Sequence, residues 1–241
     1  MYGYDLKEDL KDLLLNDLER FKNEIFAKQI ARVLNICKNG YGKSDLLWGL
    51  RVPCQRNIVK KYWKDINLND VKELLRHKVH EVRFTSLMIL VEKYKKADNN
   101  GKLYIYKIYL ENIEYINNWD LVDSSAPYIP GHYWYNNFLI DFWKYAKSGN
   151  LWKERVAMVS TMYFIRQGRF SETLELAKLF LTHKHHLIHK ASGWMLREIG
   201  KRNVRILISF LDKYFTIMPR TCLRYSIERL SYEQKKYYLE K

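Results

Sequence analysis

The chain has 241 residues, of which 47% are hydrophobic and 15% aromatic, and this composition favours a folded protein over a disordered one. Its 42 lysines and arginines outnumber its 27 acidic residues, so the formal net charge is +15, which indicates a polyanion or an anionic membrane surface as partner. Residues 182–241 alone hold 13 basic against five acidic residues, about half of the surplus.

The start of the chain and its cysteines indicate a compartment. No apolar run approaches the roughly 18 residues that a membrane span requires, and residues 1–5 lack the regions of a secretory leader. Cys37, Cys54 and Cys222 are widely spaced and form no CxxC pair, so we expect reduced thiols without a metal role. These features favour a cytoplasmic protein with no membrane partner.

The spacing of apolar residues predicts an all-α fold. Ten glycines and four prolines are too few for an all-β domain, while apolar residues recur every three or four positions. In chain order, helices are expected over residues 16–37, 53–65, 69–77, 79–96, 102–115, 119–128, 137–147, 151–167, 171–181, 187–201, 204–214, 219–230 and 232–239. Their lengths and short joints are typical of stacked helix pairs.

Residues 38–50 are the least regular stretch of the N-terminal half. Gly40 and Gly42 flank Tyr41, but the spacing of a Walker phosphate-binding loop is absent. The stretch either presents Tyr41 and Lys43 to a ligand or simply connects two helices, and both interpretations stay open.

A faint internal repeat organises the helices. Similar short segments surround Arg83, Arg155, Lys190 and Arg220, with spacings of 72, 35 and 30 residues, and the midpoint of the first spacing is residue 119. Units of about 30 to 40 residues are typical of HEAT-like solenoids, in which equivalent positions line one concave surface. We therefore predict one solenoid domain over residues 1–241 with a basic groove for a duplex backbone. Each cation alone is more often a solvated surface residue.

The segment 117–123 carries the most informative local pattern. If it is helical, Trp119 and Asp123 stand at i and i+4 and project from one face. An indole and a carboxylate together suit a cationic, electron-poor ligand. The alternative is a core tryptophan and an acidic residue that stabilises the helix start. Asp120 is interpreted as such a capping or supporting residue rather than as a catalytic one.

Other catalytic and metal-binding patterns are missing. The sequence contains no GxSxG, HExxH, EF-hand or dinucleotide fingerprint. In the histidine-rich run 183–189, His185 and His189 have the i, i+4 spacing of metal ligands, but no acid or cysteine completes a site. We favour a cluster at a helix start that donates hydrogen bonds to phosphate, and we expect neither a metal nor an organic cofactor.

Several segments together resemble the AlkD-type DNA alkylation repair family. The matching residues are 118–123, 151–155 and 190–198, with 49–53, Arg56 and 219–221, so the resemblance covers most of the chain. It implies a monomeric HEAT-like glycosylase that excises 3-methyladenine and 7-methylguanine from duplex DNA, probing the lesion without turning the base into a pocket. Carried over by position, Asp123 is the catalytic carboxylate, Trp119 and Trp194 contact the sugar and backbone, and Arg155 holds a phosphate.

The predicted DNA-binding set is wider than these matched positions. It comprises Arg155, Arg83, Lys190, Arg220, Arg51, Lys43 and Tyr41. One departure from the family is the stretch 32–37, which holds no aromatic residue where some members carry one near the lesion; Tyr41 is a candidate substitute. The alternatives are therefore a non-catalytic protein that binds branched or damaged DNA and a HEAT-type scaffold for an acidic protein partner.

Overall fold

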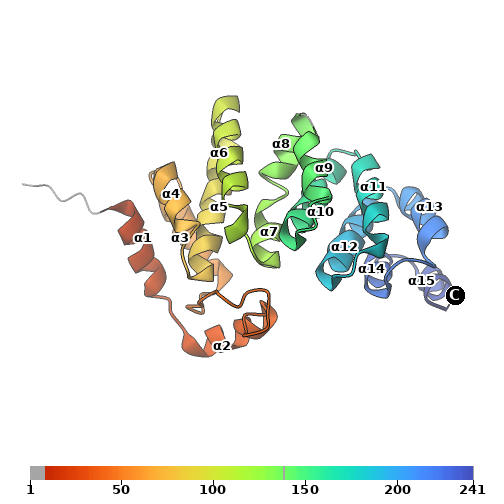
Figure 1. Cartoon of the computed structure of the whole chain (residues 1–241), viewed down its shortest axis with the longest axis horizontal. Coiled ribbons are helices and arrows are strands. Elements are labelled where there is room, and N and C mark those ends of the chain that lie inside the picture. The colour runs from red at the N-terminus through yellow and green to blue at the C-terminus, as the bar shows by residue number, and fades with distance from the viewer. Residues whose placement is uncertain (1–8, 138, 241) are drawn as a thin grey trace, which may run out of the picture. The chain divides into compact units, whose positions relative to one another are not determined.

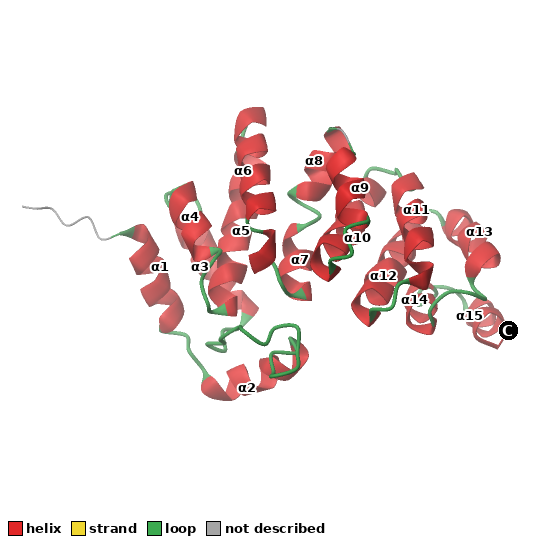
Figure 2. Cartoon of the chain, viewed as in Figure 1, coloured by secondary structure: helices red, strands yellow, loops and turns green. Residues whose placement is uncertain are grey.

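The computed structural model describes residues 9–137 and 139–240. Within these ranges it contains fifteen α-helices, two short 3-10 helices and no strand, which confirms the predicted all-α fold (Figures 1 and 2). The chain divides into two compact units, Met1–Ser125 and Ala126–Lys241. Residues 1–5, on which the expectation of no leader rests, lie outside the described part.

Unit 1 is built around one long helix. Its elements are α1 (Leu10–Glu19), α2 (Glu24–Val33), α3 (Val52–Tyr62), α4 (Leu68–Leu74), α5 (His80–Lys96), α6 (Asn99–Glu111), the 3-10 turn Ile113–Tyr115 and α7 (Trp119–Ser125). Helix α5 packs against α3, α4, α6 and α7, and Leu87, Ile89 and Leu90 on it are fully buried. A helix that is apolar on most sides forms the centre of a domain, and α5 has this role in unit 1.

Unit 2 has two central helices. Its elements are α8 (Pro130–Asn136), α9 (Ile140–Ala146), α10 (Leu151–Arg166), α11 (Ser171–Leu179), the 3-10 turn Phe180–Thr182, α12 (His186–Arg202), α13 (Val204–Tyr214), α14 (Arg220–Ser226) and α15 (Tyr232–Glu240). Helices α10 and α12 pack against each other; α8 and α9 cover α10, and α13 and α14 cover α12. Their buried residues, such as Val156, Met158 and Met195, form the core of this unit.

One predicted helix has the wrong bounds, and one helix of the structure was not predicted. Residues 16–37 form two helices, because Asn23 leaves the helical path: its amide donates to the Trp48 carbonyl at 2.9 Å and its side chain caps α2 through the Phe26 amide. Helix α8 has no counterpart among the predicted helices; it begins with Pro130 at the first helical position, which proline tolerates.

The repeat-derived cations occupy similar places in the long helices. Arg83 is the fourth residue of α5, and Arg155 and Lys190 are the fifth residues of α10 and α12. The solenoid, its basic groove and the single domain remain predictions. Among the described residues, none of the helices has both the length and the apolar character needed to cross a bilayer.

Candidate functional site

Helix α7 carries the indole and carboxylate that the sequence analysis singles out. Trp119 is its first residue and Asp123 lies one turn later, and both side chains are half-buried. The helical condition for their i, i+4 spacing is therefore met, and the two side chains share one face of α7. Leu121 and Val122, between them, are fully buried and attach the helix to the core of unit 1.

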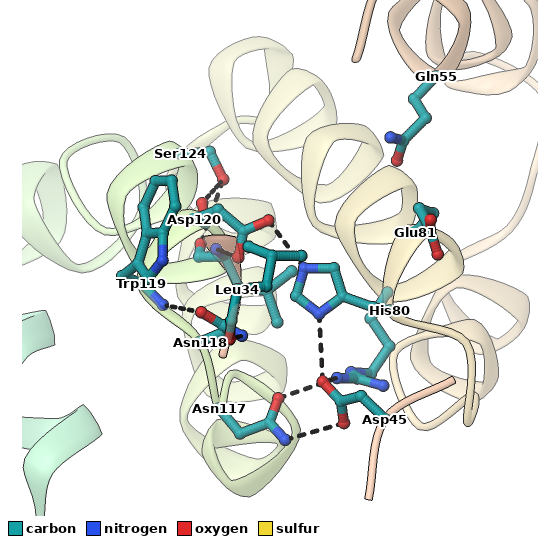
Figure 3. A network of polar contacts seen from close by, with 12 residues as sticks. Leu34, Asp45, Gln55, His80, Glu81, Asn117, Asn118, Trp119, Asp120 and Ser124 are labelled. Carbon is teal, nitrogen blue, oxygen red and sulfur yellow. Dashed lines mark hydrogen bonds and ion pairs between the residues drawn. The ribbon is translucent and has the colours of Figure 1, made fainter. Parts of the chain in front are cut away.

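Asn118 fixes the point at which α7 begins. Its side chain is fully buried, its Nδ2 donates to the carbonyl of Leu34 at 2.9 Å, and its Oδ1 accepts from the Trp119 amide at 2.8 Å (Figure 3). Leu34 ends α2, so a single amide side chain joins the end of α2 to the start of α7.

His80 joins α7 to α5. It is the first residue of α5, its side chain is 2% exposed, and its two ring nitrogens lie 2.7 Å from Asp120 Oδ2 and 3.2 Å from Asp45 Oδ2 (Figure 3). Burial lowers the pKa of His80, but the charges and hydrogen bonds of Asp120 and Asp45 outweigh it and raise the pKa to about 9. The ring is therefore an imidazolium at neutral pH and donates to both carboxylates.

Arg83 completes this cluster from the next turn of α5. Its Nη2 donates to Asp45 at 2.6 Å and to the Asn117 side chain at 2.9 Å, while Nε and Nη1 donate to the carbonyls of Tyr115 and His77. The whole residue is 3% exposed. This placement does not support the predicted contact of Arg83 with a phosphate, because the protein itself engages all three guanidinium nitrogens.

We call Asp45, His80, Arg83, Asn117 and Asp120 the His80 network. It balances two carboxylates against two cations in a space where an unpaired charge is costly. Burial raises the pKa of Asp45, but His80, Arg83 and Asn117 outweigh that effect and hold it below its usual value. The network thus joins the 38–50 stretch, α5 and the start of α7.

A second buried carboxylate attaches the 38–50 stretch to α5. Glu81 accepts hydrogen bonds from the amides of Trp48, Gly49 and Leu50 at 3.1, 2.7 and 3.2 Å. The C-terminal end of the stretch is therefore fixed to α5. From the sequence, the stretch could either present residues to a ligand or connect two helices. Glu81 and the five residues of the His80 network lie within unit 1.

The predicted contact residues of this stretch have different surroundings. Tyr41 is half-buried, whereas Lys43 and Arg51 are exposed. The Arg51 guanidinium lies 5.0 Å from the ring centre of Phe26 on α2. Helix α2 therefore carries one aromatic ring, although Phe26 lies outside the stretch 32–37 in which some family members have one. The Arg51 guanidinium lies over this ring.

The remaining predicted site residues belong to unit 2. Arg155 is buried on α10, and its Nη1 donates to the carbonyl of Leu187 at 2.5 Å. On α12, Trp194 and Lys190 are half-buried; Arg220 on α14 is exposed and donates to the Leu239 carbonyl at 2.7 Å. Their convergence with Trp119 and Asp123 remains a prediction.

The histidine-rich run builds the start of α12. His183 contacts Glu154 at 3.0 Å and accepts from the His185 amide, while His185 caps α12 by accepting from the Leu187 amide at 3.1 Å. Burial first, and then the neighbouring histidines and Arg155, lower the pKa of His185. Across the part of the chain that the structure describes, no three histidine, cysteine or acidic side chains gather as metal ligands.

Sequence reasoning missed His80, Asp45 and Asn117. Their partners lie 35 and 40 residues from His80 and 72 residues from Asn117, so no local spacing joins them. One signal was present: His80 and Glu81 open a helix whose middle is apolar, and polar residues on such a helix need partners once they are buried.

The comparisons with known proteins agree with this architecture. The family model described as "DNA alkylation repair enzyme" matches residues 14–230, so the chain belongs to the DNA alkylation repair enzyme family. A solved structure described as a predicted DNA alkylation repair enzyme from Enterococcus faecalis matches with a TM-score of 0.69 and 14% identity. The match covers 88% of this chain and 97% of that chain, and it shows a shared fold. No curated protein matches the sequence. The family resemblance is confirmed, and with it a role in repair of alkylated DNA, which implies DNA binding.

Proposed function

We propose that the protein is a DNA N-glycosylase that hydrolyses the N-glycosidic bond of cationic alkylated purines such as 3-methyladenine and 7-methylguanine. The observation that carries the proposal is the pairing of Trp119 and Asp123 on one face of α7, both half-buried. Family membership supports alkylated DNA as the substrate class. Alkylation at N3 or N7 gives a purine a positive charge, which suits a site with an indole and a carboxylate.

The chemistry needs few groups. A cationic purine is already a good leaving group, so the C1′–N bond breaks toward an oxocarbenium-like sugar without strong acid catalysis. An ionised Asp123 would stabilise that developing charge and orient the attacking water, and the indole of Trp119 would add cation-π attraction. Trp194, from unit 2, would supply the second indole, and Arg155 and Lys190 the phosphate contacts. No metal or organic cofactor enters the reaction.

Asp123→Asn tests this assignment. We expect release of 7-methylguanine and 3-methyladenine from methylated duplex DNA to fall about 100-fold or more, the typical effect of removing one transition-state electrostatic group. Affinity for the duplex should not weaken, because one negative charge facing DNA is lost. Asp65→Asn is the matched control, since it removes the same charge from an exposed position after α3. Background release by the wild-type protein, or equal release by Asp123→Asn and wild type, would refute the proposal.

The second candidate is a non-catalytic protein that binds branched or damaged DNA. It is favoured by the stretch 32–37, which ends α2 without an aromatic residue. Tight, salt-sensitive binding of a DNA junction without any base release would support it. Absence of duplex affinity at low salt would instead favour a scaffold for an acidic protein.

A further inference from the structure

We infer that His80 is a positioning residue for the proposed reaction: acting through Asp120, it sets the orientation of α7 and hence of Trp119 and Asp123. The expected effect on catalysis rests on the proposed function, but the orientation of α7 can be measured without any activity. No substrate contact is assigned to His80, whose ring is 2% exposed.

Helix α7 depends on its neighbours for its orientation. It has only seven residues, too few for a helix that is stable by itself. Leu121 and Val122 bury it in unit 1, but apolar contacts are not directional. Hydrogen bonds are directional, and the side chains of Asn117, Asn118, Asp120 and Ser125 make such bonds from α7 and the two residues before it to other parts of unit 1.

The link from Asp120 bears most directly on the candidate site. Asp120 lies three residues before Asp123 and next to Trp119, so any rotation of α7 that moves its carboxylate moves both candidate site residues. Its Oδ2 is 2.7 Å from His80 Nε2, the shortest distance that either ring nitrogen makes to a carboxylate in the network. The ring thus fixes α7 at the turn that bears the site.

His80 donates to Asp120 and Asp45 at the same time only as an imidazolium. Asp45 faces it from the 38–50 stretch, Asp120 from α7 and Arg83 from its own helix. A neutral imidazole has one N–H, so one of the two ring nitrogens would no longer donate to the carboxylate that it faces. A cation at the N-terminus of α5 is also disfavoured by the helix dipole, and the two carboxylates offset that cost.

The first experiment measures catalysis with His80→Gln and Asp120→Asn. The single-turnover rate of base release should fall about 10- to 100-fold, the effect of misplacing a catalytic group by about 1 Å. The Kd for duplex should stay within about threefold, since no predicted phosphate contact is removed. Tyr62→Phe is the control: it removes the hydrogen bond from the Tyr62 hydroxyl on α3 to Asp17 on α1, leaves the His80 network intact, and should leave the rate unchanged.

The second experiment reads the orientation of α7 without catalysis. In protein labelled with 5-fluorotryptophan, the ¹⁹F signal of Trp119, assigned with Trp119→Phe, should shift in His80→Gln and in Asp120→Asn but not in Tyr62→Phe. In wild type the same signal should titrate with a midpoint near pH 9, the pKa of about 9 for His80, and His80→Gln should abolish that titration. If His80→Gln does not fold, Asp120→Asn and the wild-type titration still decide, because Asp120 is 20% exposed and asparagine retains an acceptor oxygen.

The outcomes separate the two proposals. If the wild-type protein releases no base, the proposed function fails, and the ¹⁹F signals alone decide whether His80 orients α7. If folded His80→Gln and Asp120→Asn release bases at the wild-type rate, or if the Trp119 signal is unmoved in both, the positioning role is overturned.

Discussion

Arg83 has a structural role, whereas its residue type and its repeat position suggested a phosphate contact. A basic residue at a repeat position in a protein of net charge +15 reads as a ligand for phosphate. The structure instead buries it and gives its guanidinium two side-chain and two carbonyl partners within hydrogen-bonding distance of 3.0 Å. Periodicity located the residue, whereas its burial depended on partners remote in sequence.

Because Arg83 is buried and paired, we expect the free energy of unfolding to depend on it. Arg83→Met leaves His80 as the one cation beside the carboxylates of Asp45 and Asp120, and breaking a buried ion pair in this way costs about 3 to 5 kcal/mol. Urea unfolding followed by tryptophan fluorescence measures the loss. Lys72→Met is the control, because its pair with Glu111 is exposed and worth less than about 1 kcal/mol. Equal losses in the two variants would contradict the structural role.

For α7, the sequence predicts the spacing of the site residues but not the partner that holds the helix. The spacing of Trp119 and Asp123 follows from the sequence once the segment is helical, and the interpretation of Asp120 as supporting agrees with its contact with His80. The partner that supports it was not predictable. A histidine and an aspartate 40 residues apart meet only because α5 and α7 pack together.

At the scale of elements, joints were harder to predict than helices. The predicted helix over 79–96 matches α5 within one residue, because its apolar pattern is long and continuous. The joint before α2 was missed, because its cause is a contact between Asn23 and the Trp48 carbonyl, 25 residues away. Short-range patterns hold no trace of such a contact.

The two glycines that precede long helices test how closely these joints pack. Gly49 has φ 77° and a Cβ there would lie 2.0 Å from the Asn23 carbonyl oxygen; Gly149 has φ 68° and an added Cβ would meet nothing within 4 Å. Each amide donates to a buried glutamate, Glu81 or Glu154. Gly149→Ala should therefore cost only the left-handed strain of about 1 to 2 kcal/mol. Gly49→Ala should cost clearly more in thermal or urea unfolding, and equal costs would contradict the close approach to Asn23.

At the scale of the whole molecule, the His80 network makes stability depend on pH. The pKa of His80 is about 9 when folded, against an ordinary value of 6.5. A raised pKa stabilises the folded state fully below pH 6.5, and this contribution is lost as the pH rises from 6.5 through 9. At about 1.4 kcal/mol per unit, the full loss is about 3 kcal/mol.

Urea unfolding at several pH values between these limits measures this loss. Wild type should lose stability steadily over the window, whereas His80→Gln should be less stable at pH 6.5 and nearly flat above it. A wild-type protein whose free energy of unfolding stays constant from pH 6.5 to 9 would rule out a buried imidazolium at His80.

The charge balance of the His80 network also bears on how such a protein changes over evolutionary time. Losing Asp45, His80, Arg83 or Asp120 alone strands a buried charge, so we expect selection against single replacements at these positions for reasons of stability alone. Divergence is then expected to proceed by joint replacement, in which an acid and a base are exchanged together for uncharged residues. These four positions, spread over 76 residues of sequence, are therefore expected to change together.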